Sequence, residues 1–302
     1  MAASSRTSNR KGKAERPKQR GRHAGAKQGD HDETPLDGID AREIEEIEDR
    51  SSPRAPIIYE IVRRLGEEEL ARPVTSLWWS GVAAGLSISF SLLVQAILEM
   101  HLPDEPWRPL LSSFGYSTGF LIVVLGRQQL FTENTLTMVL PLMVDFSRAM
   151  LLRVLGIWGI VLAANLVGAL TAALFLSYTP VVALDLLHAM LQVSGHAVEH
   201  GWWAMVAKGV VSGFLIAAMV WLIPSADETQ FHVITLMTYL IAVGGFTHIV
   251  AGSVDAFMLV VNGQLGILDM AMNFTVPVFI GNVVGGTALF AMISYAQVMA
   301  EI

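Results

Sequence analysis

The feature that most constrains this chain is a series of long apolar runs that begin after Pro73. The first run, from Leu77 to Leu98, carries no charged side chain, and about 20 helical residues suffice to cross the hydrocarbon core of a bilayer. Similar runs recur along the chain, and together they predict spans at residues 77–98, 110–125, 154–176, 204–224, 233–254 and 270–295. We therefore predict an all-α membrane protein with six transmembrane helices.

Composition and charge support this class and exclude several others. Hydrophobic residues make up 53% and charged residues 16% of the chain, whereas soluble domains average about 45–50% and about 25%. The net charge of -7 provides no basic surface for a nucleic-acid backbone, so no nucleic-acid partner is expected. The chain contains no cysteine, which excludes disulfides, thiolate metal sites and a cysteine nucleophile.

The part before the spans divides into two segments. Residues 1–55 form a basic block followed by an acidic block, and such charge runs predict a disordered tail. The basic block either contacts anionic membrane lipid or is simply solvated, and the solvated tail is favoured. Residues 56–73 place apolar positions at helical spacing beside Arg63 and Arg64. They predict an amphipathic helix on the membrane surface, followed by a transmembrane domain over residues 74–298.

Basic residues predict the orientation of the chain. Arg63, Arg64 and Arg72 precede the first span, and Arg148 and Arg153 precede the third. Loops rich in Lys and Arg remain in the cytoplasm. Because six spans return the chain to the side on which it started, both termini are predicted to be cytoplasmic.

Two spans are interrupted by polar residues at membrane depth. A polar stretch at residues 126–134 follows the second span and precedes a further apolar run, and residues 244–255 interrupt the fifth span in the same way. Irregular backbone at that depth persists only where it is buried in protein or lines a cavity. Broken helices at matching places in two halves indicate inverted repeats around a central site.

The residues at these interruptions resemble the formate/nitrite transporter family. The resemblance covers roughly residues 57–295, and its motifs lie in family order at residues 116–132, 208–221, 245–251 and 274–286. It implies an aquaporin-like protomer with broken second and fifth helices, in a homopentamer in the bacterial inner membrane. It also implies a channel-like transporter that passes small monovalent anions such as formate or nitrite.

The resemblance also implies roles for individual residues. Thr132 and His248 would form a polar step at the pore centre. Two apolar constrictions would flank this step, one formed by Leu130, Phe131 and Phe120 and the other by Tyr116, Ile216 and Ile241.

Physical chemistry suggests how such a pore works. A bare anion in a dry constriction is unfavourable by several kcal/mol, whereas its neutral acid is not. A donor such as His248 could bind the anion and help it gain a proton. Passage as the neutral acid is therefore our mechanistic hypothesis.

Two departures from the family pattern leave the substrate open. Thr247 stands where the family usually has a glutamate, and Gly213 stands where it usually has a pore-facing asparagine. Losing a carboxylate beside His248 removes a charge that favours imidazolium. Nitrite, hydrosulfide, a lactate-sized acid and a neutral molecule all remain candidate permeants.

Several polar residues in and near the spans have a competing explanation. His248 could be a core histidine, but ionisable groups inside membranes are usually functional, and Thr132 could simply bond the broken backbone. Arg127 and Glu133 could draw anions into a vestibule, although an ion pair that holds the loop is slightly favoured. We expect a solvated loop, not a metal site, at the three histidines His188, His196 and His200.

Three other classes compete with a transporter. An enzyme needs a nucleophile with a base, paired carboxylates or metal ligands, and the spans hold no such set, so we expect no catalysis, cofactor or metal. A cation channel needs acidic rings or carbonyl filters, and only Glu133 and Asp255 lie near the breaks. A structural membrane protein would not need two broken helices.

Overall fold

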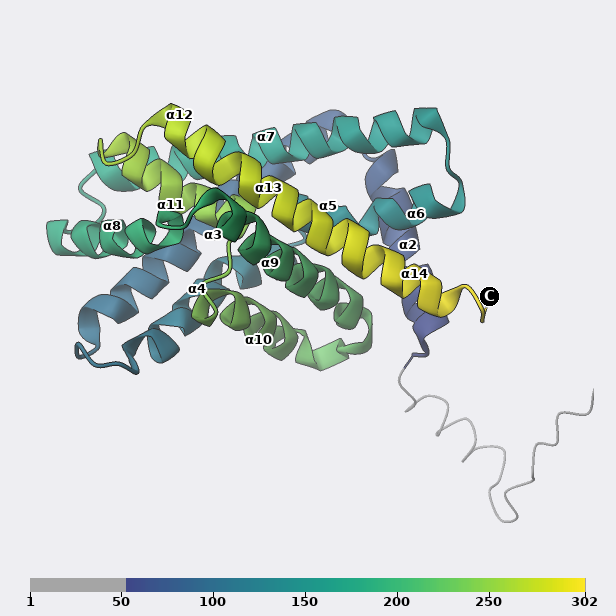
Figure 1. Cartoon of the computed structure of the whole chain (residues 1–302), viewed down its shortest axis with the longest axis horizontal. Helices are drawn as coiled ribbons and strands as arrows, with labels where there is room; N and C mark the ends of the chain where they lie inside the picture. The colour runs from purple at the N-terminus through teal and green to yellow at the C-terminus, as the bar shows by residue number, and fades with distance from the viewer. Residues whose placement is uncertain (1–52, 302) are drawn as a thin grey trace, which may run out of the picture. The chain divides into compact units, whose positions relative to one another are not determined.

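The computed structural model describes residues 53–301, which form a bundle of helices (Figure 1). Most of the predicted N-terminal tail, residues 1–52, lies outside the described residues. The first described helix is α2, Ala55–Ala71. Figure 1 shows α2 and the C-terminus at the same end of the bundle, and the rings of Tyr59 and Tyr295 lie 6.0 Å apart there. We refer to this as the α2 end.

The chain then builds two halves. The first half consists of α3 (Val74–His101), α4 (Arg108–Leu125), α5 (Phe131–Thr137), α6 (Val139–Val144) and α7 (Arg148–Tyr178). Helix α8 (Leu184–Val198) joins it to α9 (Trp202–Leu222), α10 (Gln230–Val243), α11 (Ile249–Val261), α12 (Ile267–Asp269), α13 (Val276–Val283) and α14 (Met292–Val298). Two π-helical segments, Met270–Thr275 and Val284–Ala291, connect the last three helices into one continuous rod.

The number of membrane crossings agrees with the prediction. Five helices are long and apolar enough to span a bilayer, namely Val74–His101, Arg108–Leu125, Arg148–Tyr178, Trp202–Ser225 and Ile267–Val298. Helices α10 and α11 are individually short and together form the remaining crossing. The all-α fold with six crossings and broken second and fifth helices is therefore confirmed.

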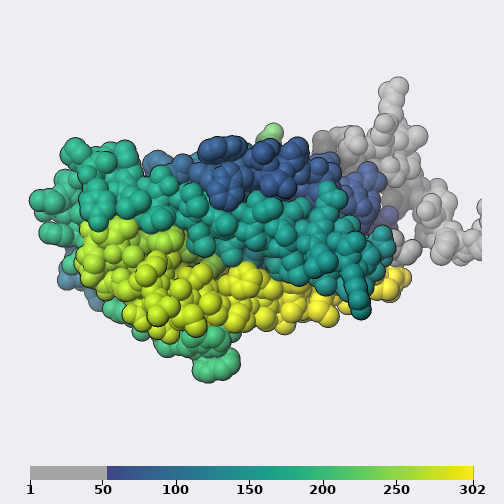
Figure 2. All heavy atoms as spheres, turned by 90° about the horizontal axis from the view of Figure 1, so that it is seen from above, coloured from purple at the N-terminus to yellow at the C-terminus, as the bar shows by residue number. Residues whose placement is uncertain are grey.

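Small residues allow the long helices to approach closely. Gly85 on α3 lies against the backbone of Asn165 on α7, and Gly213 on α9 lies against the backbone of Asn282 on α13. Gly281 likewise lies against the backbone of α9, a contact that only a small residue permits. Figure 2 shows α7, in teal, between the blue α3 and the yellow-green segment that contains α11, where the two halves meet.

The breaks are shorter than the polar stretches predicted. Helix α5 starts at Phe131 and α11 at Ile249, so Thr132 and Asp255 lie on helices. Polar residues are accommodated there because their side chains bond back to the helix. Thr135 Oγ1, for example, donates to the Thr132 carbonyl at 2.7 Å.

The segment after α7 is a further difference. The prediction of a solvated loop around His188 and His196 is wrong, because residues 184–198 form helix α8. This helix packs against α11 and α3 and buries Ala189, Met190 and Ser194.

Candidate functional site

The two helix breaks meet at one hydrogen bond. His248 is the N-cap of α11, and its Nδ1 accepts a hydrogen bond from the Ala251 N–H at 3.2 Å. Its Nε2 lies 2.8 Å from Thr132 Oγ1 on α5. Because a backbone N–H can only donate, Nδ1 has no hydrogen and the single ring hydrogen of neutral His248 is on Nε2. Nε2 therefore donates to Thr132, and both side chains are buried.

An asparagine from the last long helix of each half fixes each break. Asn165 Oδ1 accepts from the Phe131 N–H at 2.9 Å, and its Nδ2 donates to the carbonyls of Gln129 and Gly81 at 2.9 and 2.8 Å. One side chain thus binds the backbone on both sides of the first break and joins it to α3. The free N–H and C=O groups of the broken helix are satisfied without water.

Asn282 does the same in the second half. Its Oδ1 accepts from the Ile249 N–H at 2.8 Å, and its Nδ2 donates to the carbonyls of Thr247 and Gly209 at 3.0 and 2.9 Å. The equivalence of the two asparagines is direct evidence for two structural repeats.

The sequence interpretation did not assign this role to either asparagine. A signal exists, because both the third and the sixth predicted spans contain an asparagine followed three residues later by glycine, Asn165 with Gly168 and Asn282 with Gly285. An amide in an apolar span that faces a broken helix is expected to bind the broken backbone.

Aromatic rings surround the His248–Thr132 bond. The Phe120 ring lies edge-on to His248 with centroids 5.0 Å apart, and Tyr116 lies 5.2 Å from Phe120. On the other side, Phe131 stacks on Phe279 at 5.4 Å. Phe120 and Phe131 are fully buried, so a dry aromatic layer encloses the polar pair.

Two cavities approach this layer from opposite ends. The first cavity has a volume of about 140 Å³, and His248, Tyr116 and Asp255 are among its lining residues. We call it the α8-end cavity, because His196 of α8 also lines it. The α2-end cavity has a volume of about 210 Å³, and Glu69 and Glu133 are among its lining residues. His248 of the polar pair lines the α8-end cavity, and Glu133, which directly follows Thr132 in the chain, lines the α2-end cavity.

The other residues predicted to line the pore lie in three kinds of position. Leu130, Ile216 and Ile241 are fully buried and line neither of these cavities. Thr247 lines the α8-end cavity, while its carbonyl accepts from Asn282. Gly213 permits the close crossing of α9 and α13 described above.

Arg127 and Glu133 both line the α2-end cavity. The slightly favoured ion pair between them is not formed, because no salt bridge joins these two described residues. Glu133 Oε1 is instead buried with no hydrogen-bond partner among residues 53–301. Arg127, with φ of 51°, forms the tight turn that follows α4.

The fold and this convergence of cavities define a class of membrane protein with two broken helices around a central polar step. A family model described as formate/nitrite transporter matches residues 56–296. The chain belongs to the formate/nitrite transporter family.

Relatives and solved structures agree with this assignment. The chain is 42% identical over 257 residues to the inner membrane protein YfdC of Escherichia coli (strain K12), covering 85% of this chain and 83% of that protein. It is 25% identical to the formate channel BtFdhC of Bacillus thuringiensis, covering 79% and 93%. A pentameric formate channel with formate bound has a similar fold, with a TM-score of 0.64, 19% identity and coverage of 75% of this chain and 98% of that one.

Proposed function

We propose that this protein is a channel-like transporter that passes small monovalent anions, or their conjugate acids, past the Thr132–His248 pair. The observation that carries the proposal is that His248 of this buried hydrogen bond lines one cavity, while Glu133, the residue after Thr132, lines a second cavity at the α2 end. A structural protein would gain nothing from hollows on both sides of a buried polar pair.

The barrier between the cavities favours a neutral permeant. Phe120 and Phe131 are fully buried in this layer, and an unpaired anion in such an apolar environment is unfavourable by several kcal/mol. The Nε2–H of His248 and the hydroxyl of Thr132 provide a donor and an exchangeable hydroxyl at this depth. A small acid that takes the place of their mutual bond keeps its polar atoms hydrogen-bonded while it crosses.

The bonding of His248 refines our hypothesis about its role. Release of the only ring hydrogen, from Nε2, would leave an imidazolate, while addition of a hydrogen to Nδ1 would break the cap bond to Ala251. His248 therefore acts as a hydrogen-bond donor to the permeant, and the permeant gains its proton from another group.

Orientation, location and assembly complete the proposal. Arg72, Arg148 and Arg153 support a cytoplasmic location of the α2 end and of both termini. In this proposal residues 56–73 lie at the membrane surface and residues 74–298 form the transporter domain. Two relatives named above support a bacterial inner membrane and a homopentamer, because one is called an inner membrane protein and the other a pentameric channel.

The test is uptake of formate, nitrite and hydrosulfide into proteoliposomes, followed by stopped flow. We expect the native chain to raise uptake of at least one of them above that of protein-free liposomes. His248→Ala should reduce this uptake about fivefold to hundredfold, since leaving a buried polar group of the permeant without its hydrogen-bond partner is unfavourable by about 1–3 kcal/mol.

The matched control is His232→Ala, because His232 is an exposed histidine on α10 outside both cavities. Its uptake should equal that of the native chain. Absence of uptake of all three permeants by the native chain would contradict the proposal and indicate a different solute.

A further inference from the structure

Asp255 is a buried acid that the sequence interpretation left without a role. It lies on α11 and lines the same cavity as His248. Only 8% of the residue is exposed. Its Oδ1 accepts a hydrogen bond from Ser194 Oγ on α8 at 3.2 Å, whereas Oδ2 forms no hydrogen bond to any residue among 53–301. One carboxyl oxygen is therefore free to face a molecule in the cavity.

A second, larger hollow adjoins this cavity and shares lining residues with it. An open bowl of about 880 Å³ lies at the α8 end, and its lining residues include Glu99, Asp185, His188 and His196. His196 and Val193 line both the bowl and the α8-end cavity. His196 thus stands at the boundary between bulk water and the space in front of Asp255.

Apart from Asp255 and His196, the titratable groups of the α8-end cavity are poor proton donors to an entering anion. His248 is held as the Nε2–H tautomer by its cap bond. Tyr116 is a phenol, with an ordinary pKa of about 10. His200 Nε2 bonds Lys208 Nζ at 2.8 Å, and burial together with Lys208 lowers the pKa of His200.

We propose that Asp255 donates a proton to the anion in the α8-end cavity and that His196 returns a proton to Asp255 from bulk water. This inference rests on the proposed function, and it names the group that supplies the proton. An O–H bond forms on the permeant as the O–H bond of Asp255 breaks, and Asp255 becomes a carboxylate. A hydronium ion in the bowl then restores the proton through His196, so charge and atoms balance.

Asp255 could serve only to fasten α8 to α11 through Ser194. The two roles differ in their dependence on pH. A fastening role affects uptake at every pH, whereas a proton donor matters only when neutral acid is scarce in bulk water. Asp255→Asn keeps the shape and the bond from Ser194 but cannot exchange the proton, and Ser194→Ala removes the fastening bond but keeps the acid.

The experiment measures formate uptake into proteoliposomes at external pH values between about 4.5 and 7.5, together with internal pH by an enclosed dye. We expect Asp255→Asn to lose at least about tenfold in uptake near pH 7 and to approach the native rate near pH 4.5, where bulk formic acid is plentiful. Ser194→Ala should keep the native pH profile. Asp255→Glu should keep proton exchange and restore uptake near pH 7.

Two results would overturn the inference. One is a pH profile of Asp255→Asn equal to that of the native chain, and the other is an increase in uptake, which would make Asp255 a charge that repels the anion. If Asp255→Asn does not assemble, His196→Gln takes its place, because it removes the proposed supply of protons to Asp255. Loss of uptake near pH 7 with near-native uptake near pH 4.5 in this variant supports the inference, and a native pH profile contradicts it. Failure of the native chain to take up formate, nitrite or hydrosulfide would instead reject the proposed function.

Discussion

The ring of His248 forms a hydrogen bond through each of its nitrogens, and these two bonds determine which nitrogen can donate to a permeant. One nitrogen caps α11 and the other donates to Thr132. The sequence singled out His248 because an ionisable group inside a span is usually functional, and the family resemblance paired it with Thr132. It could not show which nitrogen carries the hydrogen, because that depends on the N–H of Ala251, which points at the ring only when the helix begins at Ile249.

Gly213 provides a residue-scale prediction. A Cβ at this position would meet the backbone of Asn282, which cannot move without disturbing the second break. We expect Gly213→Ala to destabilise the protein by about 1–3 kcal/mol, measured as a lower midpoint of thermal unfolding in detergent.

Gly156 is the matched control, because it lies on α7 with no atom within 4 Å of the position of a Cβ. Gly156→Ala should leave the midpoint unchanged or raise it slightly, since alanine favours helix by up to about 1 kcal/mol. Equal midpoints for the two variants would contradict the close crossing of α9 and α13.

At the level of elements, the lengths of the membrane spans were predictable from the sequence, whereas the residues at which the helices after the breaks begin were not. The polar stretch from Gly126 to Asn134 indicated a break, yet only its first part is irregular, because Asn165 binds the backbone on both sides and lets α5 begin at Phe131. Helix α8 was not predicted, because the histidines of this segment indicated a solvated loop, whereas the apolar face of the same segment favours a helix. Ala189 and Met190 on that face are buried.

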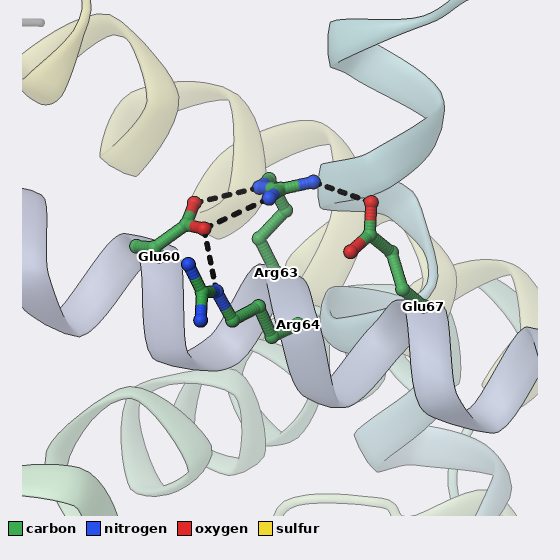
Figure 3. Close-up of polar contacts among 4 residues, drawn as sticks. All are labelled: Glu60, Arg63, Arg64 and Glu67. Atoms are coloured by element: carbon green, nitrogen blue, oxygen red, sulfur yellow. Dashed lines mark hydrogen bonds and ion pairs between the residues drawn. The ribbon is translucent and has the colours of Figure 1, made fainter. Parts of the chain in front are cut away.

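Helix α2 provides a prediction of pH dependence. Hydrogen bonds from Arg63 and Arg64 lower the pKa of Glu60 to about 2 from its ordinary 4.5 (Figure 3). Because the folded-state pKa is depressed, these pairs stabilise the helix above pH 4.5, and this stabilisation is lost as the pH falls toward 2. The pairs are partly exposed, so each contributes only about 0.3–0.5 kcal/mol.

Hydrogen exchange of peptides from residues 55–71 measures this effect after correction for intrinsic rates. We expect Glu60→Gln to increase the hydrogen-exchange rate of α2 by less than about fivefold at neutral pH. Acidification of the native chain from about pH 5 to about pH 3 should increase this rate by a similar factor. Glu68→Gln is the control, because Glu68 is exposed and forms no ion pair among the described residues. Equal exchange in both variants would contradict a stabilising role for Glu60.

At the level of the whole molecule, two repeats place one polar pair between two cavities. The spans and the repeats were predictable, since apolar lengths and paired interruptions are properties of the sequence alone. The cavities were not, because their walls combine residues from distant segments. Glu69 of α2, for example, lines the α2-end cavity and accepts a hydrogen bond from Thr137 of α5.

The central claim is that permeants pass through both cavities, and single cysteines test it most directly because the chain has none of its own. Ala197→Cys places a thiol in the α8-end cavity and Gln128→Cys places one in the α2-end cavity. His232→Cys is the exposed control outside both. We predict that a methanethiosulfonate reagent with a bulky group abolishes formate or nitrite uptake in the first two variants and leaves the control unchanged. Complete modification at both cavity positions with undiminished uptake would contradict the account.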